Sequence, residues 1–150
     1  MLFFRLEDDN YRGVYCVHPY AFFAPPSDET AYDTQRHPVP GKDTRLQAGL
    51  VAKGLKGWDL EYVHKRGHYR FGFSSRKQLR AWFYDESLYV AMTANGVKLS
   101  IYEVPEVIEG NAQAVIAAEH HTPQNLVARI SLKTAVKRHW KNLIPKKKIN

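Results

Sequence analysis

Large hydrophobic side chains alternate with small or polar ones most clearly in residues 69–73. Phe71 and Phe73 are separated by a glycine and preceded by an arginine, so every second position is large and apolar. A period of two places such side chains on one face of a β-strand. The pattern therefore predicts a strand over residues 69–73 with one face in the core.

A helix is predicted directly after this strand. Ser75 is followed three residues later by Gln78, the spacing of a capping box, so the helix is expected to begin at Arg76. Its apolar side chains then recur at helical spacing, at Leu79, Trp82 and Phe83. A tight strand-to-helix corner lies at a sheet edge, where ligands often bind, so Ser74 and Ser75 are candidate site residues.

The remaining pattern predicts a mixture of strands and helices without regular alternation. Strands are predicted over residues 2–7, 14–17, 59–64, 97–101, 112–118 and 126–130. Helices are predicted over residues 46–55 and 85–94, and at the C-terminus through Leu132, Ala135, Val136, Trp140 and Leu143. This mixture favours an α+β class, with a single domain over residues 1–150 and a split, mostly antiparallel sheet.

Residues 18–56 contain five prolines and little periodicity, which is typical of a functional loop or a lid. Within it, prolines stiffen the segment 35–41 around Arg36 and His37. An arginine and a histidine held in a preset direction suit phosphate or another anion. The alternative is a proline-anchored loop that lies across the core.

Length and composition describe a folded globular chain. The 150 residues are 44% hydrophobic and 13% aromatic, enough for a core without cross-links. The single cysteine, Cys16, excludes an intrachain disulfide, and no apolar run is long enough for a signal peptide or a membrane span. These features favour a cytoplasmic protein with no membrane partner.

The net charge of +7 is concentrated at the C-terminus. Residues 120–150 contain eight of the 22 basic residues and none of the 15 acidic ones. Such asymmetry favours an anionic partner, and the candidate nucleic-acid-binding residues are Lys133, Lys137, Arg138, Lys141, Lys146, Lys147 and Lys148. The alternative is a solvated helix face that ends in a flexible basic tail over residues 145–150.

Common catalytic and metal-binding motifs are absent. The chain has no P-loop, no dinucleotide-binding glycine pattern, no nucleophile elbow and no zinc-protease motif. The lone cysteine and the spacing of the seven histidines give no metal-ligand set, so no metal site is predicted.

The order of three polar positions resembles the toxin-like ADP-ribosyltransferases, whose catalytic residues occur in the order Arg, Ser, Glu. Arg5 lies on the first predicted strand, Ser74 and Ser75 end a later strand, and Gln113 lies on a late strand. The resemblance implies that Arg5 holds NAD and that the serines organise the cleft. Gln113 occupies the usual glutamate position, which implies that any transferase activity is weak, altered or lost.

The chain also resembles small bacteriophage and prophage proteins, through its Phe-Gly-Phe-x-Ser and Gln-Leu-x-x-Trp-Phe motifs. That resemblance implies a bacterial cytoplasm as the place of action. The leading hypothesis is a phage accessory protein with an NAD-binding cleft that modifies or binds a host component. The alternatives are a nucleic-acid-binding protein and an inhibitor of a host protein, both acting through the basic C-terminus.

Overall fold

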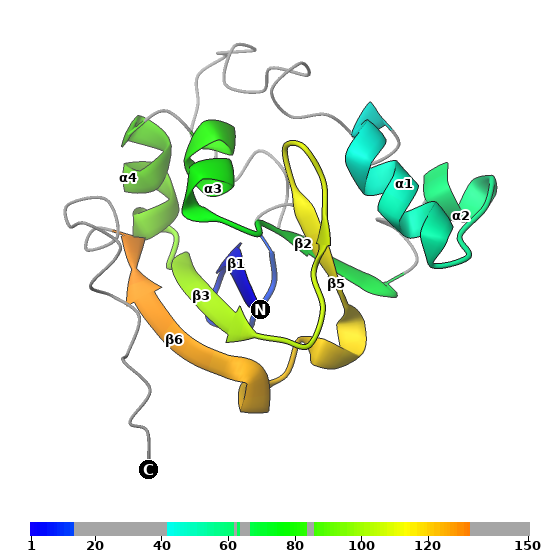
Figure 1. Cartoon of the computed structure of the whole chain (residues 1–150). Coiled ribbons are helices and arrows are strands. Elements are labelled where there is room, and N and C mark those ends of the chain that lie inside the picture. Colours follow the sequence, from blue (N-terminus) through cyan, green and yellow to red (C-terminus); the bar gives the residue numbers. More distant parts are fainter. Residues whose placement is uncertain (14–41, 62, 64–66, 84–85, 133–150) are drawn as a thin grey trace.

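The computed structural model describes residues 1–13, 42–61, 63, 67–83 and 86–132 (Figure 1). The predicted strand over residues 14–17, the C-terminal helix and the tail over residues 145–150 lie outside the described residues.

Within the described residues, six strands form two small antiparallel sheets, which confirms the expected α+β class and the split sheet. In the β1 sheet the order is β1-β3-β6, with bounds Leu2–Glu7, Lys98–Glu103 and Leu126–Ser131. In the β2 sheet the order is β2-β5-β4, with bounds Tyr69–Gly72, Ala114–Ala117 and Ile108–Glu109. The two sheets meet where Phe4 pairs with Phe73, so β1 and β2 lie side by side at the junction.

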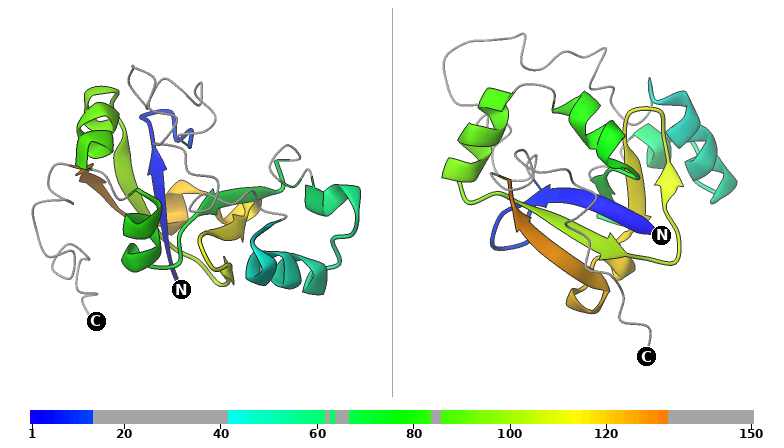
Figure 2. Two further views of the ribbon diagram at one scale, coloured as in Figure 1. Left: turned by 90° about the horizontal axis from the view of Figure 1, so that it is seen from above. Right: turned by 60° about the vertical axis from the view of Figure 1, so that its left-hand side comes forward.

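The described part of the chain also forms four α-helices: α1 (Thr44–Ala52), α2 (Trp58–Glu61), α3 (Arg76–Trp82) and α4 (Glu86–Ala94). In Figure 1 and Figure 2, α3 and α4 lie near the β1 sheet, whereas α1 and α2 lie beside the β2 sheet. Two short 3-10 turns, Ala118–His120 and Pro123–Asn125, connect β5 to β6.

The apolar face predicted for α3 is the one that is buried. Leu79 and Trp82 of α3 pack with Met92 of α4 against Phe4 and Leu99 of the β1 sheet. On the other side of the molecule α1 packs on β4 and β5, and between the sheets lies a third cluster around Phe3 and Tyr102. Burial of these apolar surfaces is the main force that holds the helices on the sheets.

Two expectations about the strands are wrong. The segment predicted as a strand over residues 59–64 begins as the short helix α2, because local hydrogen bonds from Asp59 and Leu60 to the carbonyls of Lys56 and Gly57 close a turn. The alternation of Val97, Leu99 and Ile101 with Lys98 and Ser100 predicts a half-buried strand over 97–101, with one exposed face. Both faces of β3 are buried, including Ser100, because the second face is covered by Glu7, His121 and the apolar cluster around Phe3 and Tyr102.

Candidate functional site

A hollow of about 530 Å³ lies beside the strand-to-helix corner. Its apolar wall comes from Met1, Leu2, Phe4 and Val107, and its polar groups are those of Ser74, Ser75, Arg76 and Glu109. We call it the serine hollow. A second hollow of about 290 Å³ lies near the end of α1, and none of the predicted site residues lines it.

Ser74 and Glu109 form the central polar contact of the serine hollow. The Ser74 hydroxyl donates to Oε1 of Glu109 over 2.6 Å, and the Arg45 guanidinium donates to Oε2 of the same carboxylate over 2.6 Å. Both carboxylate oxygens therefore have a partner. The Glu109 and Arg45 side chains are 42% and 58% exposed, so a ligand can reach them.

The corner is held in place by Gln78. Ser75 caps α3 as predicted, since its hydroxyl accepts from the Gln78 amide over 3.1 Å. The Gln78 side chain accepts from the amide of Ser74 rather than that of Ser75, and it donates to the carbonyls of Gly110 and Gln113. Gln78 thus ties the serine corner to the turn between β4 and β5.

Asp43 fixes the same turn from the side of α1, and sequence reasoning missed it. Its buried carboxylate caps α1 at the amide of Leu46 and accepts from the amides of Asn111 and Ala112 over 2.8 and 2.9 Å. An added Cβ on Gly110 would lie 2.5 Å from an Asp43 carboxylate oxygen, so the turn needs glycine there. An aspartate before an apolar helical segment is a known cap signal, but it does not reveal the contact with the turn.

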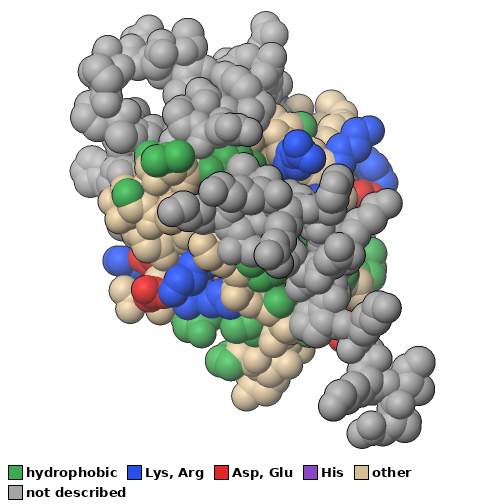
Figure 3. Space-filling view, turned by 90° about the vertical axis from the view of Figure 1, so that its left-hand side faces the viewer, with side chains coloured by type: hydrophobic (Ala, Val, Ile, Leu, Met, Phe, Trp, Pro, Cys, Tyr) green, Lys and Arg blue, Asp and Glu red, His purple; other side chains and the backbone are tan. Residues whose placement is uncertain are grey.

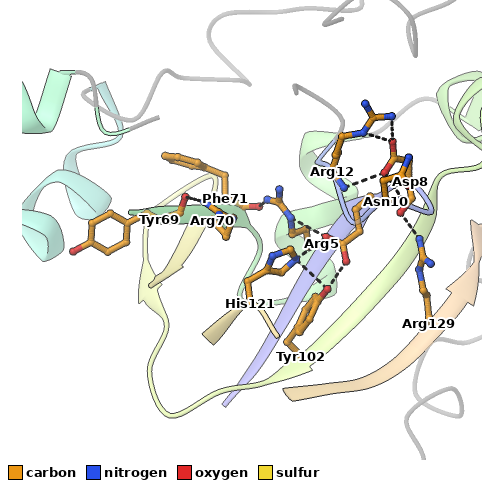
Figure 4. Close-up of polar contacts among 11 residues, drawn as sticks. Arg5, Asp8, Asn10, Arg12, Tyr69, Arg70, Phe71, Tyr102, His121 and Arg129 are labelled. Atoms are coloured by element: carbon orange, nitrogen blue, oxygen red, sulfur yellow. Dashed lines mark hydrogen bonds and ion pairs between the residues drawn. The ribbon is translucent and has the colours of Figure 1, made fainter. Parts of the chain in front are cut away.

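Arg5 lies away from the serine hollow. Leu2 and Phe4 line the hollow, and alternation along β1 places Arg5 on the opposite face of the strand. There its guanidinium donates to Glu7 over 3.0 Å and to the Phe71 carbonyl of β2 (Figure 4).

Glu7 is the centre of a buried polar cluster on this face. It accepts from Arg5, from the Tyr102 hydroxyl and from Nε2 of His121, the last over 2.9 Å. Nε2 of His121 also lies 3.0 Å from the Tyr102 hydroxyl oxygen. We call Arg5, Glu7, Tyr102 and His121 the seam network. Glu7 is fully buried and the His121 side chain is 11% exposed.

Burial and pairing act in opposite directions on Glu7. Burial alone raises the pKa of its carboxyl, but hydrogen bonds from His121 and Tyr102 and the positive charge of Arg5 outweigh it. The net pKa of Glu7 therefore lies below its usual value, and the group is ionised at neutral pH. Burial and the adjacent Glu7 raise the pKa of Tyr102, which stays protonated and can donate.

The four residues expected to share a cleft are thus divided. Ser74 and Ser75 line the serine hollow, and Arg5 belongs to the seam network. Gln113 is buried directly before β5, where its main-chain carbonyl accepts from Gln78 and Gly110. The acidic group that the structure brings to the serines is Glu109, four residues before Gln113.

Two predicted binding sets lie outside the described residues. They are Arg36 and His37 of the proline-rich segment, and the basic residues Lys133, Lys137, Arg138, Lys141, Lys146, Lys147 and Lys148. On one face of the described part of the molecule, several basic side chains lie beside acidic ones (Figure 3). Lys98 and Arg129, for example, both pair with Asp9, at 2.8 and 3.3 Å.

The family model of the bacteriophage T4 Y00F protein matches residues 1–133. The chain belongs to this family. Membership confirms the expected likeness to small bacteriophage proteins. No curated protein and no solved structure matches the chain.

Two further features of the described residues bear on binding. No helix among them has both the length and the apolar character needed to cross a membrane. No group of three or more histidine, cysteine, aspartate or glutamate side chains in the same part of the chain is arranged to hold a metal ion.

Proposed function

We propose that this member of a bacteriophage family binds a nicotinamide dinucleotide in the serine hollow and uses it to modify or bind a component of the host cytoplasm. The observation that carries the proposal is the contact between Ser74 and Glu109 at the edge of an open hollow. It places a serine at the end of one strand beside a carboxylate on the next part of the sheet, similar to the arrangement in the ADP-ribosyltransferases that the sequence resembles.

The residues of the serine hollow fit such a ligand. Its volume of about 530 Å³ falls within the range of small-molecule sites. The apolar wall formed by Phe4 and Val107 suits the face of a nicotinamide ring, and Arg76 suits a phosphate. Burial lowers the pKa of Arg76, but a guanidinium stays charged at neutral pH.

The chemistry of the site depends on Glu109. Bound NAD would supply a glycosidic bond that places positive charge on the ribose as nicotinamide leaves. A fixed carboxylate stabilises such charge, and Ser74 and Arg45 hold the carboxylate of Glu109 from two sides. Glu109 therefore takes the role that the sequence resemblance gave to position 113.

Calorimetry and thermal unfolding with millimolar NAD test the proposal. We expect wild type to bind, and Ser74→Ala to bind more weakly because the carboxylate loses one of its two partners. Glu109→Gln should retain most of the affinity and lose any release of nicotinamide. Glu106→Gln is the matched control, because Glu106 is 55% exposed, pairs with Lys53 and lies outside the hollow. Absence of heat and of a thermal shift in wild type would reject the site.

The charge asymmetry of the sequence supports a second candidate, binding of nucleic acid or of a host protein through residues 133–150. A gel shift at two salt concentrations, with and without these residues, tests the nucleic-acid form. The affinity for nucleic acid should fall steeply as salt is raised and when residues 133–150 are removed. A gel shift that is unchanged by the truncation would show that the basic C-terminus does not bind the nucleic acid. A nuclease-treated pull-down from bacterial lysate separates a protein partner from a nucleic-acid bridge.

A further inference from the structure

The turn between β4 and β5 is held from two sides. It consists of residues 110–113 and lies between α3 and α1 (Figure 1). Asp43, the cap of α1, accepts from two of its main-chain amides over 2.8 and 2.9 Å. Gln78 of α3 donates to two of its main-chain carbonyls over 3.0 and 3.3 Å. Glu109 directly precedes the turn, so both contacts influence where its carboxylate lies.

The Gln78 side chain uses all of its hydrogen-bonding positions. Its Oε1 accepts from the Ser74 amide over 2.9 Å and lies 3.3 Å from the Ser74 hydroxyl oxygen. Its Nε2 donates to the carbonyls of Gly110 and Gln113. A carboxamide has two acceptor positions on oxygen and two N–H donors, so this orientation is the one that satisfies both sides. Because Gln78 is only 8% exposed, water is poorly placed to replace a lost contact.

Helix capping alone does not require glutamine at this position. A capping box uses either glutamate or glutamine three residues after the cap, because both have an acceptor oxygen. A glutamate would offer the same acceptor to Ser74, but its second oxygen would face two carbonyls, which only accept. The turn between β4 and β5 therefore requires the amide of Gln78, whereas the start of α3 does not.

The Ser74 hydroxyl lies between the two segments that Gln78 connects. Its oxygen is 2.6 Å from Oε1 of Glu109 and 3.3 Å from Oε1 of Gln78. The hydroxyl has one proton, and the shorter distance and the charge of the carboxylate assign that proton to Glu109. Gln78 holds the main chain of Ser74 at one end and the turn that follows Glu109 at the other. The length of the Ser74–Glu109 hydrogen bond therefore depends on Gln78.

We propose that Gln78 is a positioning residue, which sets the distance between the Ser74 hydroxyl and the Glu109 carboxylate. Ser74 and Glu109 line the serine hollow, and Gln78 does not. The inference rests on the proposed function for one consequence, the weaker binding of NAD when the contact is loosened. The contact joins two side chains of the protein, so it can also be measured in the absence of NAD.

Carbon-13 NMR of the glutamate carboxylates in the full chain tests the proposal without NAD. The resonance of a carboxylate carbon shifts when a hydrogen-bond donor is lost, and the Glu109 signal is identified by its absence in Glu109→Gln. We expect Ser74→Ala to shift this signal, and Gln78→Met, which has a similar length but no amide, to shift it in the same direction. Ser75→Ala is the matched control, because it weakens the cap of α3 and keeps the Gln78 side chain. It should leave the signal in place.

A second variant keeps the test decisive if Gln78→Met does not fold. Gln78→Asn retains the carboxamide but is shorter by one methylene, so it cannot reach both Ser74 and the turn. It adds no charge beside Glu109, and it should shift the Glu109 signal as well. An unchanged signal in the folded variant, or an equal shift in Ser75→Ala, would overturn the proposal.

Calorimetry with NAD separates this inference from the proposed function. Gln78→Met should bind NAD about fivefold more weakly than wild type, as for the loss of one neutral hydrogen bond, and Ser75→Ala should bind as wild type does. If wild type does not bind NAD, the proposed function fails, and the carboxylate signal still decides the role of Gln78. If wild type binds NAD and Gln78→Met has the same affinity, the positioning role alone is rejected.

Discussion

On the two sides of β1 the molecule has the same chemistry, an arginine paired with a glutamate, in opposite surroundings. On one face Arg5 donates to Glu7 over 3.0 Å, and the Glu7 side chain is fully buried. On the other side of the strand lies the serine hollow, where Arg45 donates over 2.6 Å to a Glu109 that is 42% exposed. The shorter distance belongs to the pair that water can reach.

Surroundings rather than distance decide what each pair does. A buried charge that loses its partner is left without water to replace it, so the Arg5–Glu7 pair constrains the fold. An exposed pair contributes little to stability, because water and salt compete for both groups. In the Arg45–Glu109 pair, either side chain can therefore leave the other and contact a ligand instead. The buried side chains of the seam network cannot exchange partners in this way.

Replacing glutamate by glutamine on the two sides of β1 gives the largest expected difference in the free energy of unfolding. Glu7→Gln removes the carboxylate of the buried ion pair with Arg5 and should lower the free energy of unfolding by about 3–5 kcal/mol. Glu109→Gln should lower it by less than about 1 kcal/mol. Urea unfolding at pH 7 measures both values, and equal losses would contradict the contrast between the faces.

Acid should weaken the buried face first. The pKa of Glu7 is lowered in the folded state, because hydrogen bonds from His121 and Tyr102 and the charge of Arg5 outweigh the effect of burial. The lowered pKa adds stability that is fully present above the pKa of the carboxyl in the unfolded chain, about 4.3. This stability is lost as the pH falls through the lower pKa of Glu7 in the folded state. Unfolding of wild type and Glu7→Gln in a pH series should show the difference between them shrinking in acid. A difference that stays constant would show that Glu7 does not titrate with folding.

The two serines of the corner should separate stability from ligand binding. Ser75→Ala removes the cap of α3 and should lower the free energy of unfolding by about 1 kcal/mol. Ser74→Ala should change it by less than about 0.5 kcal/mol, because Ser74 is a partly exposed surface residue, while weakening NAD binding. Thermal unfolding with and without NAD distinguishes the two variants. A larger loss of stability in Ser74→Ala, or a larger loss of NAD binding in Ser75→Ala, would contradict the roles given to the two serines.

The smallest expected effect is that of Arg45. Arg45→Gln should lower the free energy of unfolding by about 0.2–1 kcal/mol at low salt. The loss should largely vanish near 1 M salt, where exposed charges are screened within about 3 Å. Unfolding at both salt concentrations measures this, and a large loss that salt does not change would show that the pair is not exchangeable.

The local pattern of the chain predicted most elements because they depend on near neighbours. The strand over residues 2–7, the Ser75 cap and the end of α4 beside Gly96, with φ of +76°, are set by residues a few positions apart. The prediction over 59–64 was wrong because a weak alternation competed with a local turn. The two-residue strand β4 is too short to show any period.

The site could not be predicted in the same way because it depends on long-range contacts. Ser74 meets Glu109 across 35 residues, and Glu7 meets His121 across 114. The alternating pattern around Arg5 is the same whether the arginine binds a ligand or is buried against an internal partner. The carboxylate two residues later on the same face was the available sign of an internal partner.

The pairing of β1 with β3 has a consequence for synthesis. Leu2 pairs with Glu103, so β1 cannot pair with β3 until about 100 further residues have been made. At about 5–20 residues per second, that interval is roughly 5–20 s. During this interval on the ribosome, the apolar side chains of β1 lack the cover that pairing with β3 provides. They are those of Phe3, Phe4 and Leu6. These exposed apolar side chains favour contact with a chaperone early in synthesis, and the β1 sheet forms only after β3 has been made.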